Sequence, residues 1–344
     1  MTEQHLLSAG PLLDEKGNLV EAGFAYSLVK TYSRQAIKAR KGRIKEWDYY
    51  YVGNKDRGIA LTIDDNGYMD LCSATVFDFP KKERIEKMIS HPFSYGKRHL
   101  PETSAVGDTF YHDKKVEMRF THEGTKRHLY CVWPKFDRAG RELRVDLLLE
   151  ETTGGNTMVI ATPFLKPRHF YYNQKINNLK STGYAKLGDD FLDFNKESYG
   201  VLDWGRGVWT YKNLWFWSSA SGIQEGHTIG WNLGYGFGDT SKASENMLFI
   251  DQEAYKLNDV KFDIPMDEKA HEDYLKPWKF RSSDGAIDLT FTPILDRAGG
   301  GNFLILRSDQ HQCFGTFKGY FHVDGKSFQV LDLPGFAEKV YNRW

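Results

Sequence analysis

The sequence predicts an all-β protein with few short helices, built as two β-barrel halves that an internal duplication produced. Three observations lead to this fold class. Hydrophobic residues alternate with polar ones at a period of two, turn dipeptides recur along the chain, and landmarks of the first half return in the second half. Aromatic residues make up 15% of the 344 residues, and such a content favours strands and ligand surfaces lined by flat rings.

Period-2 alternation is clearest at residues 143–149 and 287–291, where leucine, isoleucine, valine or phenylalanine occupies every second position. This pattern indicates strands with one dry face. Turn dipeptides lie between such segments at Asn66-Gly67, Glu123-Gly124, Asp284-Gly285 and Asp324-Gly325. The last of them separates FKGYFHV from KSFQVLDL, which predicts a β-hairpin.

Two segments have helical rather than strand patterns. The first is Ser33–Trp47. The second is Pro80–Ser90, in which Pro80 suits the first turn of a helix and His91-Pro92 would end it. These are the few helices that the sequence predicts.

The duplication is indicated by four landmarks in the same order. WPKFDRAG, which contains Pro134, is echoed by TPILDRAG, which contains Pro293, 159 positions later. The other matches pair Gly124 with Gly285, residues 47–51 with 215–217, and residues 66–68 with 233–235. We therefore expect an N-terminal β unit over residues 1–165 and a C-terminal β unit over 166–344 that holds the main pocket. A unit of this size suffices for a barrel of about eight strands with room for a ligand.

Composition narrows the class of partner. Lys+Arg and Asp+Glu both number 46, so there is no basic excess to favour nucleic acid. The basic segment RQAIKARKGRIK is interpreted as an exposed face, with a local binding patch as the alternative. No apolar stretch approaches the length of a membrane span, and the N-terminus lacks a signal-peptide pattern.

The cysteines Cys72, Cys131 and Cys313 lie far apart without a CxxC motif. This favours a reduced, cytoplasmic setting without disulfides. The sequence has no HExxH, P-loop, GxGxxG fingerprint or GxSxG motif, so we expect no metal and no cofactor.

The segment YGVLDWGRGVWTYKNLWFWSSASG concentrates tryptophans around Asp203 and Arg206. The glycines on both sides of Arg206 predict that the backbone turns there. The two charged side chains could pair across this bend, and the guanidinium could stack on an indole. Two interpretations stay open. The pair is structural, or Asp203 transfers a proton within an apolar cavity, where desolvation raises its pKa and Arg206 opposes that shift.

The segment HTIGWNLGYGFGD separates large residues from glycines by parity, because a strand sends alternate side chains to opposite faces. It is either a curved strand whose rings fill the core, or a pocket wall that carries Trp231 and Tyr235 and ends in Asp239. Asn173, in FYYNQK, either lines a polar end of the pocket or caps a strand.

Several motifs together resemble the bacterial and fungal domain-of-unknown-function family 2804 over nearly the whole chain; they are YNQKIN, YGVLDWGRGVW, NLGYGFGD, SENMLF, QHQ and the ending FAEKVYNRW. The family name assigns no reaction. The expected architecture is similar to that of paired lipocalin-like proteins, a group that includes carotenoid hydratases, tocopherol cyclases and AttH-like proteins. This likeness implies a cavity for an apolar, often isoprenoid ligand. It also implies acid chemistry in which an Asp protonates an alkene and Trp rings shelter the cation.

Three functional hypotheses remain at this stage. One is a cofactor-independent lyase or isomerase with an aromatic pocket, the second is a non-catalytic carrier of a lipid-like molecule, and the third is a carbohydrate-active protein with paired Asp residues. The partner is accordingly a small apolar ligand or a glycan. The candidate catalytic residues are Asp203, Asp239 and Arg206. The candidate ligand-binding residues are Trp204, Trp209, Trp215, Trp217, Trp231, Tyr235 and Asn173.

Overall fold

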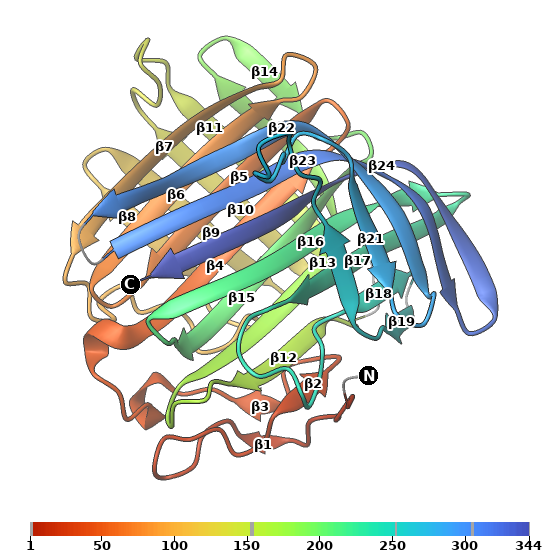
Figure 1. Cartoon of the computed structure of the whole chain (residues 1–344). Coiled ribbons are helices and arrows are strands. Elements are labelled where there is room, and N and C mark those ends of the chain that lie inside the picture. The colour runs from red at the N-terminus through yellow and green to blue at the C-terminus, as the bar shows by residue number, and fades with distance from the viewer. Residues whose placement is uncertain (1–2, 152–154, 252, 304–305, 344) are drawn as a thin grey trace.

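The computed structural model describes residues 3–151, 155–251, 253–303 and 306–343. These residues form strands almost throughout, and the helices among them are two short 3₁₀ turns, η1 (Arg34–Ala36) and η2 (Lys41–Arg43). The all-β fold class is therefore confirmed. Two sheets curl into half-barrels that lie against each other, and a small parallel pair, β1 (Gly10–Pro11) and β3 (Lys30–Thr31), lies beside them (Figure 1).

The first sheet has 13 strands, ten of which follow the order β7-β6-β5-β4-β15-β13-β11-β10-β9-β8. Their bounds are β4 (Ile44–Gly53), β5 (Arg57–Asp65), β6 (Met69–Asp78), β7 (Glu83–Pro92), β8 (Thr109–Asp113), β9 (Val116–Glu123), β10 (Lys126–Trp133), β11 (Leu143–Glu151), β13 (Phe170–Leu187) and β15 (Ser198–Val208). Three short strands attach to this path: β2 (Gly23–Ala25), β12 (Met158–Pro163) and β14 (Asp190–Asp193).

The second sheet has nine strands in the order β19-β18-β17-β16-β24-β23-β22-β21-β20. Their bounds are β16 (Lys212–Gln224), β17 (His227–Tyr235), β18 (Met247–Ile250), β19 (Glu253–Lys256), β20 (Val260–Asp263), β21 (Trp278–Ser282), β22 (Ile287–Phe303), β23 (Leu306–Val323) and β24 (Lys326–Arg343). The long strands β22, β23 and β24 reach across the face of the first sheet (Figure 1).

The two sheets share one connectivity, which supports two lipocalin-like halves. Each begins with a meander of four strands, β4–β7 or β16–β19, and the first strand of that meander pairs with the last strand of a second meander, as β4 with β15 and β16 with β24. The matched aromatic clusters lie on the equivalent strands β4 and β16. The matched turns at Gly124 and Gly285 close the hairpins β9–β10 and β21–β22, which are not at equivalent places, because β10 corresponds to β21 when β15 is matched with β24. The two DRAG segments differ locally, because the first is a loop after β10 and the second lies within β22.

The chain passes from the first sheet to the second between Val208 and Lys212, which are the last residue of β15 and the first of β16. The expected division at residue 165 stays a prediction, because membership of a sheet does not by itself divide a chain into domains. It nevertheless matters for the site that β13 and β15 belong to the first sheet.

The expected strands and the four expected turn dipeptides are confirmed, whereas both expected helices are wrong. Residues 143–151 form β11 with alternating burial, and Val323 pairs with Lys326 around the Asp324-Gly325 turn. Ser33–Trp47 forms η1, η2 and the start of β4. Pro80–Ser90 forms a turn and most of β7, an edge strand whose one free side tolerates the charged residues that suggested a helix.

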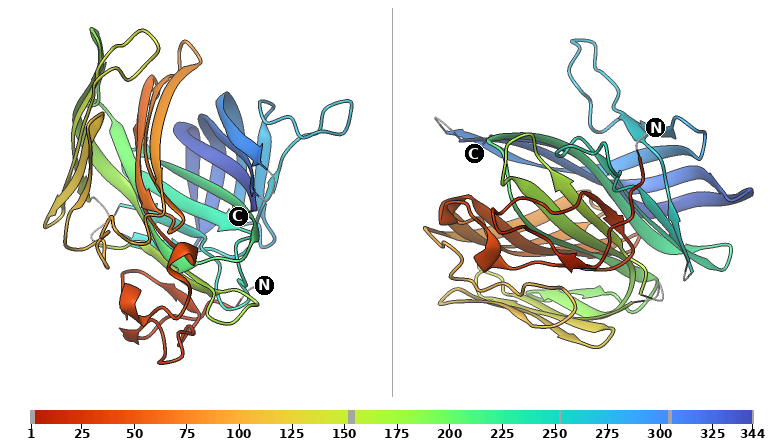
Figure 2. Two further views of the ribbon diagram at one scale, coloured as in Figure 1. Left: turned by 90° about the vertical axis from the view of Figure 1, so that its left-hand side faces the viewer. Right: turned by 90° about the horizontal axis from the view of Figure 1, so that it is seen from below.

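Each half-barrel has its own hydrophobic core, and further aromatic clusters lie between the halves. One such cluster joins Tyr49, Tyr51 and Phe77 of the first sheet to Phe314 and Phe336 of the second. Two views at right angles to that of Figure 1 show how closely the sheets approach along β15 and β16 (Figure 2). Within the described ranges, no helix has the length and apolar character needed to cross a membrane.

Candidate ligand cavity between the two sheets

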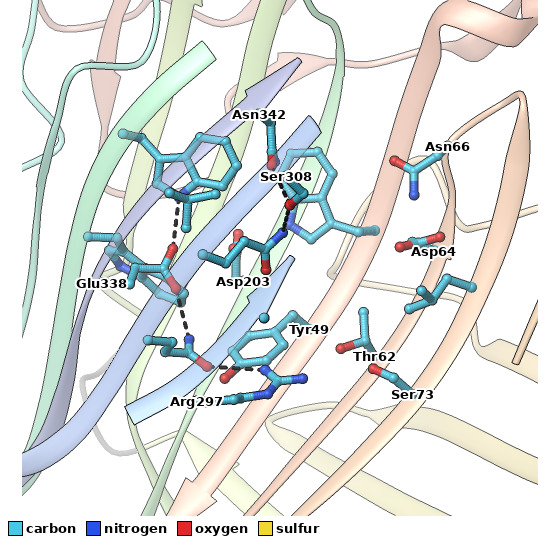
Figure 3. Close-up of a pocket in the computed structure, with 18 of the residues that line it drawn as sticks. Tyr49, Thr62, Asp64, Asn66, Ser73, Asp203, Arg297, Ser308, Glu338 and Asn342 are labelled. Atoms are coloured by element: carbon cyan, nitrogen blue, oxygen red, sulfur yellow. Dashed lines mark hydrogen bonds between the residues drawn. The ribbon is translucent and has the colours of Figure 1, made fainter. Parts of the chain in front are cut away.

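A cavity of about 520 Å³ lies between the two half-barrels (Figure 3). Strands β4–β7, β13 and β15 provide one wall, and β16 with β22–β24 provides the other. The volume lies in the range of small-molecule sites. From the sequence we expected the pocket within the C-terminal unit, but residues of both sheets line it. The reason is that the aromatic face of β16 packs toward β4 and β15 rather than into its own barrel.

Aromatic rings line one part of this cavity. They are Trp47, Tyr171, Trp209, Trp215, Trp217 and Phe237. Trp209 and Trp215 both pack edge-on against Phe237, at centroid distances of 4.8 and 5.4 Å. Three of the tryptophans predicted from the sequence therefore meet here, and they meet from the β15–β16 connection and from one face of β16.

A chain of polar contacts crosses the rest of the cavity and centres on Glu338. The indole Nε1 of Trp215 donates to Oε1 of Glu338 at 2.8 Å, and the amide of Gln312 donates to Oε2 at 2.9 Å. Arg297 donates to the Gln312 carbonyl oxygen at 3.1 Å and also pairs with Glu86. Because Arg297 occupies the Gln312 oxygen, the amide nitrogen of Gln312 is the end that faces Glu338.

The pKa of Glu338 is raised to about 7. Burial is the main cause, since the side chain is only 8% exposed, and hydrogen bonding by Trp215 opposes it. Burial likewise raises the pKa of Asp64 and of Glu245, two other carboxyls of the cavity. Burial thus favours the protonated form of all three acids, and the value for Glu338 lies near neutral pH.

Asp203 lines the cavity as an ion pair. Its Oδ1 lies 2.7 Å from Nζ of Lys175 and accepts a hydrogen bond from Nδ2 of Asn173 at 2.6 Å. Lys175 also stands 3.9 Å above the ring of Trp217. Asn173 donates in addition to the backbone oxygen of Trp204, so it fixes the carboxylate to β15.

The expected turn at Arg206 is wrong, because residues 198–208 form the regular strand β15, which pairs with β13 and β4. The glycines serve close approach instead. A Cβ at Gly205 would lie 1.9 Å from the Trp47 ring, and one at Gly207 would lie 2.4 Å from the backbone oxygen of Phe170. Both positions therefore accept only glycine without local rearrangement.

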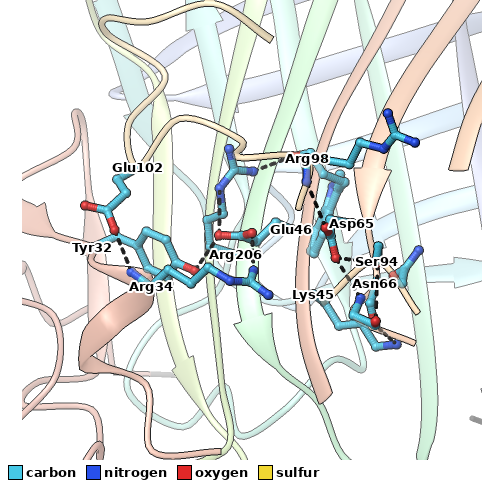
Figure 4. Close-up of polar contacts among 12 residues, drawn as sticks. Tyr32, Arg34, Lys45, Glu46, Asp65, Asn66, Ser94, Arg98, Glu102 and Arg206 are labelled. Atoms are coloured by element: carbon cyan, nitrogen blue, oxygen red, sulfur yellow. Dashed lines mark hydrogen bonds and ion pairs between the residues drawn. The ribbon is translucent and has the colours of Figure 1, made fainter. Parts of the chain in front are cut away.

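In a strand, residues three apart point to opposite faces, so Asp203 and Arg206 do not pair. Arg206 is fully buried on the other side of the sheet from the cavity (Figure 4). It donates to Asp48 Oδ1 at 3.1 Å and to the backbone oxygens of Trp47 and Pro101 at 2.8 Å. Its guanidinium stacks on the Trp204 ring at 4.3 Å, as the sequence suggested.

The remaining candidate residues lie outside the cavity. Trp204 packs in the first core against Tyr172, and Trp231 packs in the second core. Tyr235 stacks on Phe216 at 4.5 Å. Asp239 is exposed, so the structure does not bring it to the cavity with Asp203 as a carboxylate pair.

Strand β17 follows the first interpretation of its parity pattern, because its rings pack in a core and do not line the cavity. Its large residues Ile229, Trp231 and Leu233 fill the second core. Its glycines admit side chains from the opposite direction, because a Cβ at Gly230 would meet the Asn178 side chain at 2.0 Å and one at Gly234 would meet Glu245 at 2.7 Å.

Four charged residues of the site were not predicted from the sequence: Glu338, Arg297, Glu86 and Glu245. A signal did exist for Glu338, because alternation along β24 places it on the same face as Phe336 and Val340. An acid on an otherwise apolar face is an indication of function or of a buried partner. In the described ranges, no group of three His, Cys, Asp or Glu side chains is arranged to hold a metal.

The fold is that of a lipocalin-like β protein of two halves with a cavity of small-molecule size between them. The chain belongs to the family described as "Domain of unknown function (DUF2804)", which matches residues 3–344. This match confirms the resemblance seen in the sequence motifs. A search of curated proteins found no match.

Two solved structures support the fold. An AttH-like protein of Nitrosomonas europaea superposes with a TM-score of 0.52 at 10% identity, over 92% of this chain and 98% of that one. Kievitone hydratase from Nectria haematococca superposes with a TM-score of 0.51 at 12% identity, over 100% and 98%. At such identities the likeness extends to the fold alone.

Proposed function

We propose that the protein binds a small molecule with an apolar, lipid-like or isoprenoid body in the cavity between its halves, and that it catalyses proton-transfer chemistry there, of the hydration or isomerisation type. The observation that carries this proposal is Glu338, a buried carboxyl that opens on an aromatic cavity and has a pKa of about 7.

A pKa near the working pH suits a group that must both give and take a proton. An unperturbed glutamic acid is almost fully ionised at pH 7 and delivers protons poorly. Glu338 is half protonated there, and its two hydrogen-bond donors, Trp215 and Gln312, hold the carboxyl in one orientation toward the cavity.

The chemistry balances without a further reactant. In a hydration, Glu338 transfers its proton to one alkene carbon, water adds to the other carbon, and the proton lost by that water returns to the carboxylate. In an isomerisation, the carboxylate instead removes a proton from a neighbouring carbon. The positive charge between the two steps faces the aromatic rings, whose negative faces stabilise a cation. The Asp203–Lys175 pair lies beside this path and contributes a fixed dipole.

The fold likeness to kievitone hydratase adds an analogy at the level of architecture. A carrier function is the second candidate, and the firm attachment of Asp203 to Lys175 and Asn173 favours it, because a locked carboxylate has a structural explanation. The glycosidase hypothesis loses its expected Asp pair, since Asp239 is exposed.

Two measurements test the proposal. Native mass spectrometry of the purified protein, followed by extraction, identifies the class of any bound molecule. A panel of isoprenoid and phenolic alkenes is then incubated with the protein in ¹⁸O-labelled water and, separately, in D₂O. We expect incorporation of label by the native protein and its loss in Glu338→Gln, while Glu150→Gln, an exposed change on β11, retains full activity.

Glu338→Gln that keeps its ligand and still incorporates label would overturn the assignment of the acid. A retained ligand with no labelled product from any alkene would favour the carrier. In the productive case the rate should fall as pH rises above about 7, because the acid form of Glu338 is then depleted.

A further inference from the structure

Glu245 has no part in the proton transfer described above, yet the fold provides a place for it. It lies in the segment between β17 and β18 and lines the cavity. Its Oε1 approaches Gly234 so closely that a Cβ there would lie 2.7 Å away. Asn232 donates to its backbone oxygen at 2.7 Å and only weakly, at 3.4 Å, to its carboxylate. Gly234 leaves room for the Glu245 carboxylate, and the contact from Asn232 fixes the backbone of Glu245. The carboxylate itself accepts one weak hydrogen bond, from Asn232.

The cavity has more acids than bases. Its described lining holds five carboxyls, Asp64, Glu86, Asp203, Glu245 and Glu338, against two cations, Lys175 and Arg297. Lys175 is paired with Asp203 and Arg297 with Glu86.

The other cation near Glu245 points elsewhere. Lys256 donates to Ser244 Oγ and to the backbone oxygen of Asn246, both at 2.8 Å. Within the part of the chain that the structure describes, no cation lies within 4.0 Å of the Glu245 carboxylate. Burial raises the pKa of Glu245, because the charges of Lys175 and Lys256 and the hydrogen bond from Asn232 only partly offset the desolvation.

Two aromatic residues of the cavity, Tyr171 and Trp217, are linked to this acid. Burial raises the pKa of Tyr171, and the negative charge of Glu245 adds to that shift. Asn232, which contacts Glu245, also accepts a hydrogen bond from the indole of Trp217 at 2.7 Å. The Lys175 ammonium already stands over the Trp217 ring at 3.9 Å, which shows that a cation is stable against this wall. Ring faces together with a carboxylate form the arrangement that proteins use to bind ammonium groups.

We propose that Glu245 is a subsite for a positively charged nitrogen, so that the ligand of this cavity is an apolar molecule that carries a protonated amine or a quaternary ammonium group. The inference rests on the proposed function in one respect, namely that the same cavity takes up the ligand. It goes further by naming the charge of that ligand and the residue that binds it. Glu338 would then act on the apolar part of the molecule while Glu245 holds the nitrogen.

The test uses two probes of matched size, 4-phenylbutylammonium and 4-phenylbutan-1-ol, titrated at pH 7.5 and low salt with tryptophan fluorescence as the readout. We expect the cation to bind at least tenfold more tightly than the alcohol. Glu245→Gln should abolish that preference, whereas Glu245→Asp should retain most of it. Glu338→Gln and the surface control Glu150→Gln should keep a clear preference for the cation.

Equal affinity for the two probes in the native protein, or an unchanged preference in Glu245→Gln, would overturn the inference. Absence of binding by either probe would overturn it as well. The proposed function is judged separately by ¹⁸O incorporation, which uses neither probe, so the two failures are distinguishable. Thermal unfolding of each variant confirms that a lost preference is not a lost fold, and Glu245→Asp keeps the test valid if the Gln variant is unstable.

Discussion

The raised pKa of Glu338 predicts a pH-dependent penalty to folding that can be measured without a substrate. In the unfolded chain this carboxyl titrates near 4.5, and in the folded protein near 7. The folded state therefore binds the proton more tightly, and stability is lost as pH rises through the window from 4.5 to 7. A shift of that size corresponds to about 3 kcal/mol.

Glu338→Gln removes the titration and exposes this penalty. The variant also disturbs one of the hydrogen bonds from Trp215 and Gln312, because an amide accepts with one end only. That loss is the same at every pH. The informative quantity is therefore how the difference in unfolding free energy between the variant and the native protein changes with pH. The free energy of unfolding of Glu338→Gln relative to the native protein should rise by about 3 kcal/mol from pH 4.5 to pH 8.

Urea denaturation at several pH values, followed by tryptophan fluorescence, provides this double difference. Contributions from other titrating groups, Asp64 and Glu245 among them, cancel because both proteins contain them. A difference that stays constant within 0.5 kcal/mol across the range, the usual scatter for independent sites, would refute the burial argument and with it the proposed acid.

Three further changes test the packing around the site. Gly205→Ala should destabilise the protein by about 2 kcal/mol or more, since its Cβ meets an indole ring, whereas Gly301→Ala, which has open space, should be nearly neutral in thermal unfolding. Arg206→Met should cost about 3–5 kcal/mol in urea denaturation, because it leaves the buried Asp48 without its cation; a neutral result would contradict the structural role. Trp215→Phe should raise the pKa of Glu338 further, since the lost indole hydrogen bond favours the carboxylate, and the pH profile of label incorporation should move upward.

Much of the fold could be predicted because strands and turns leave local signals. The alternation at 143–149 and the Asp-Gly hairpin at 324–325 depend on neighbours in sequence, and both are confirmed. The helix predicted at Pro80–Ser90 is wrong, because the charged residues that favour a helix are equally common on an exposed edge strand such as β7. Only the pairing with the preceding strand β6 decides between them, and the residues of 80–90 alone do not show that pairing.

The turn predicted at Arg206 failed for a related reason. Glycine permits a turn, but it also permits a ring or a backbone to lie against a strand, and a sequence does not state which applies. At Gly205 the deciding fact is a tryptophan some 160 positions away, on the paired strand β4.

The candidate site was predicted in part. Residues that lie close together in the sequence were found, and residues that only the fold brings together were not. The tryptophans near Asp203 were found because they share one segment with it, which crosses from one sheet to the other. Glu338 and Arg297 lie on β24 and β22, and they reach the cavity only because those strands cross the first sheet. The cavity draws three of its tryptophans from the segment that joins the two sheets, whereas Arg297 and Glu338 come from strands far along the chain. The ring pattern therefore indicates where a ligand binds, whereas the acids that act on it become visible only when the two half-barrels are placed together.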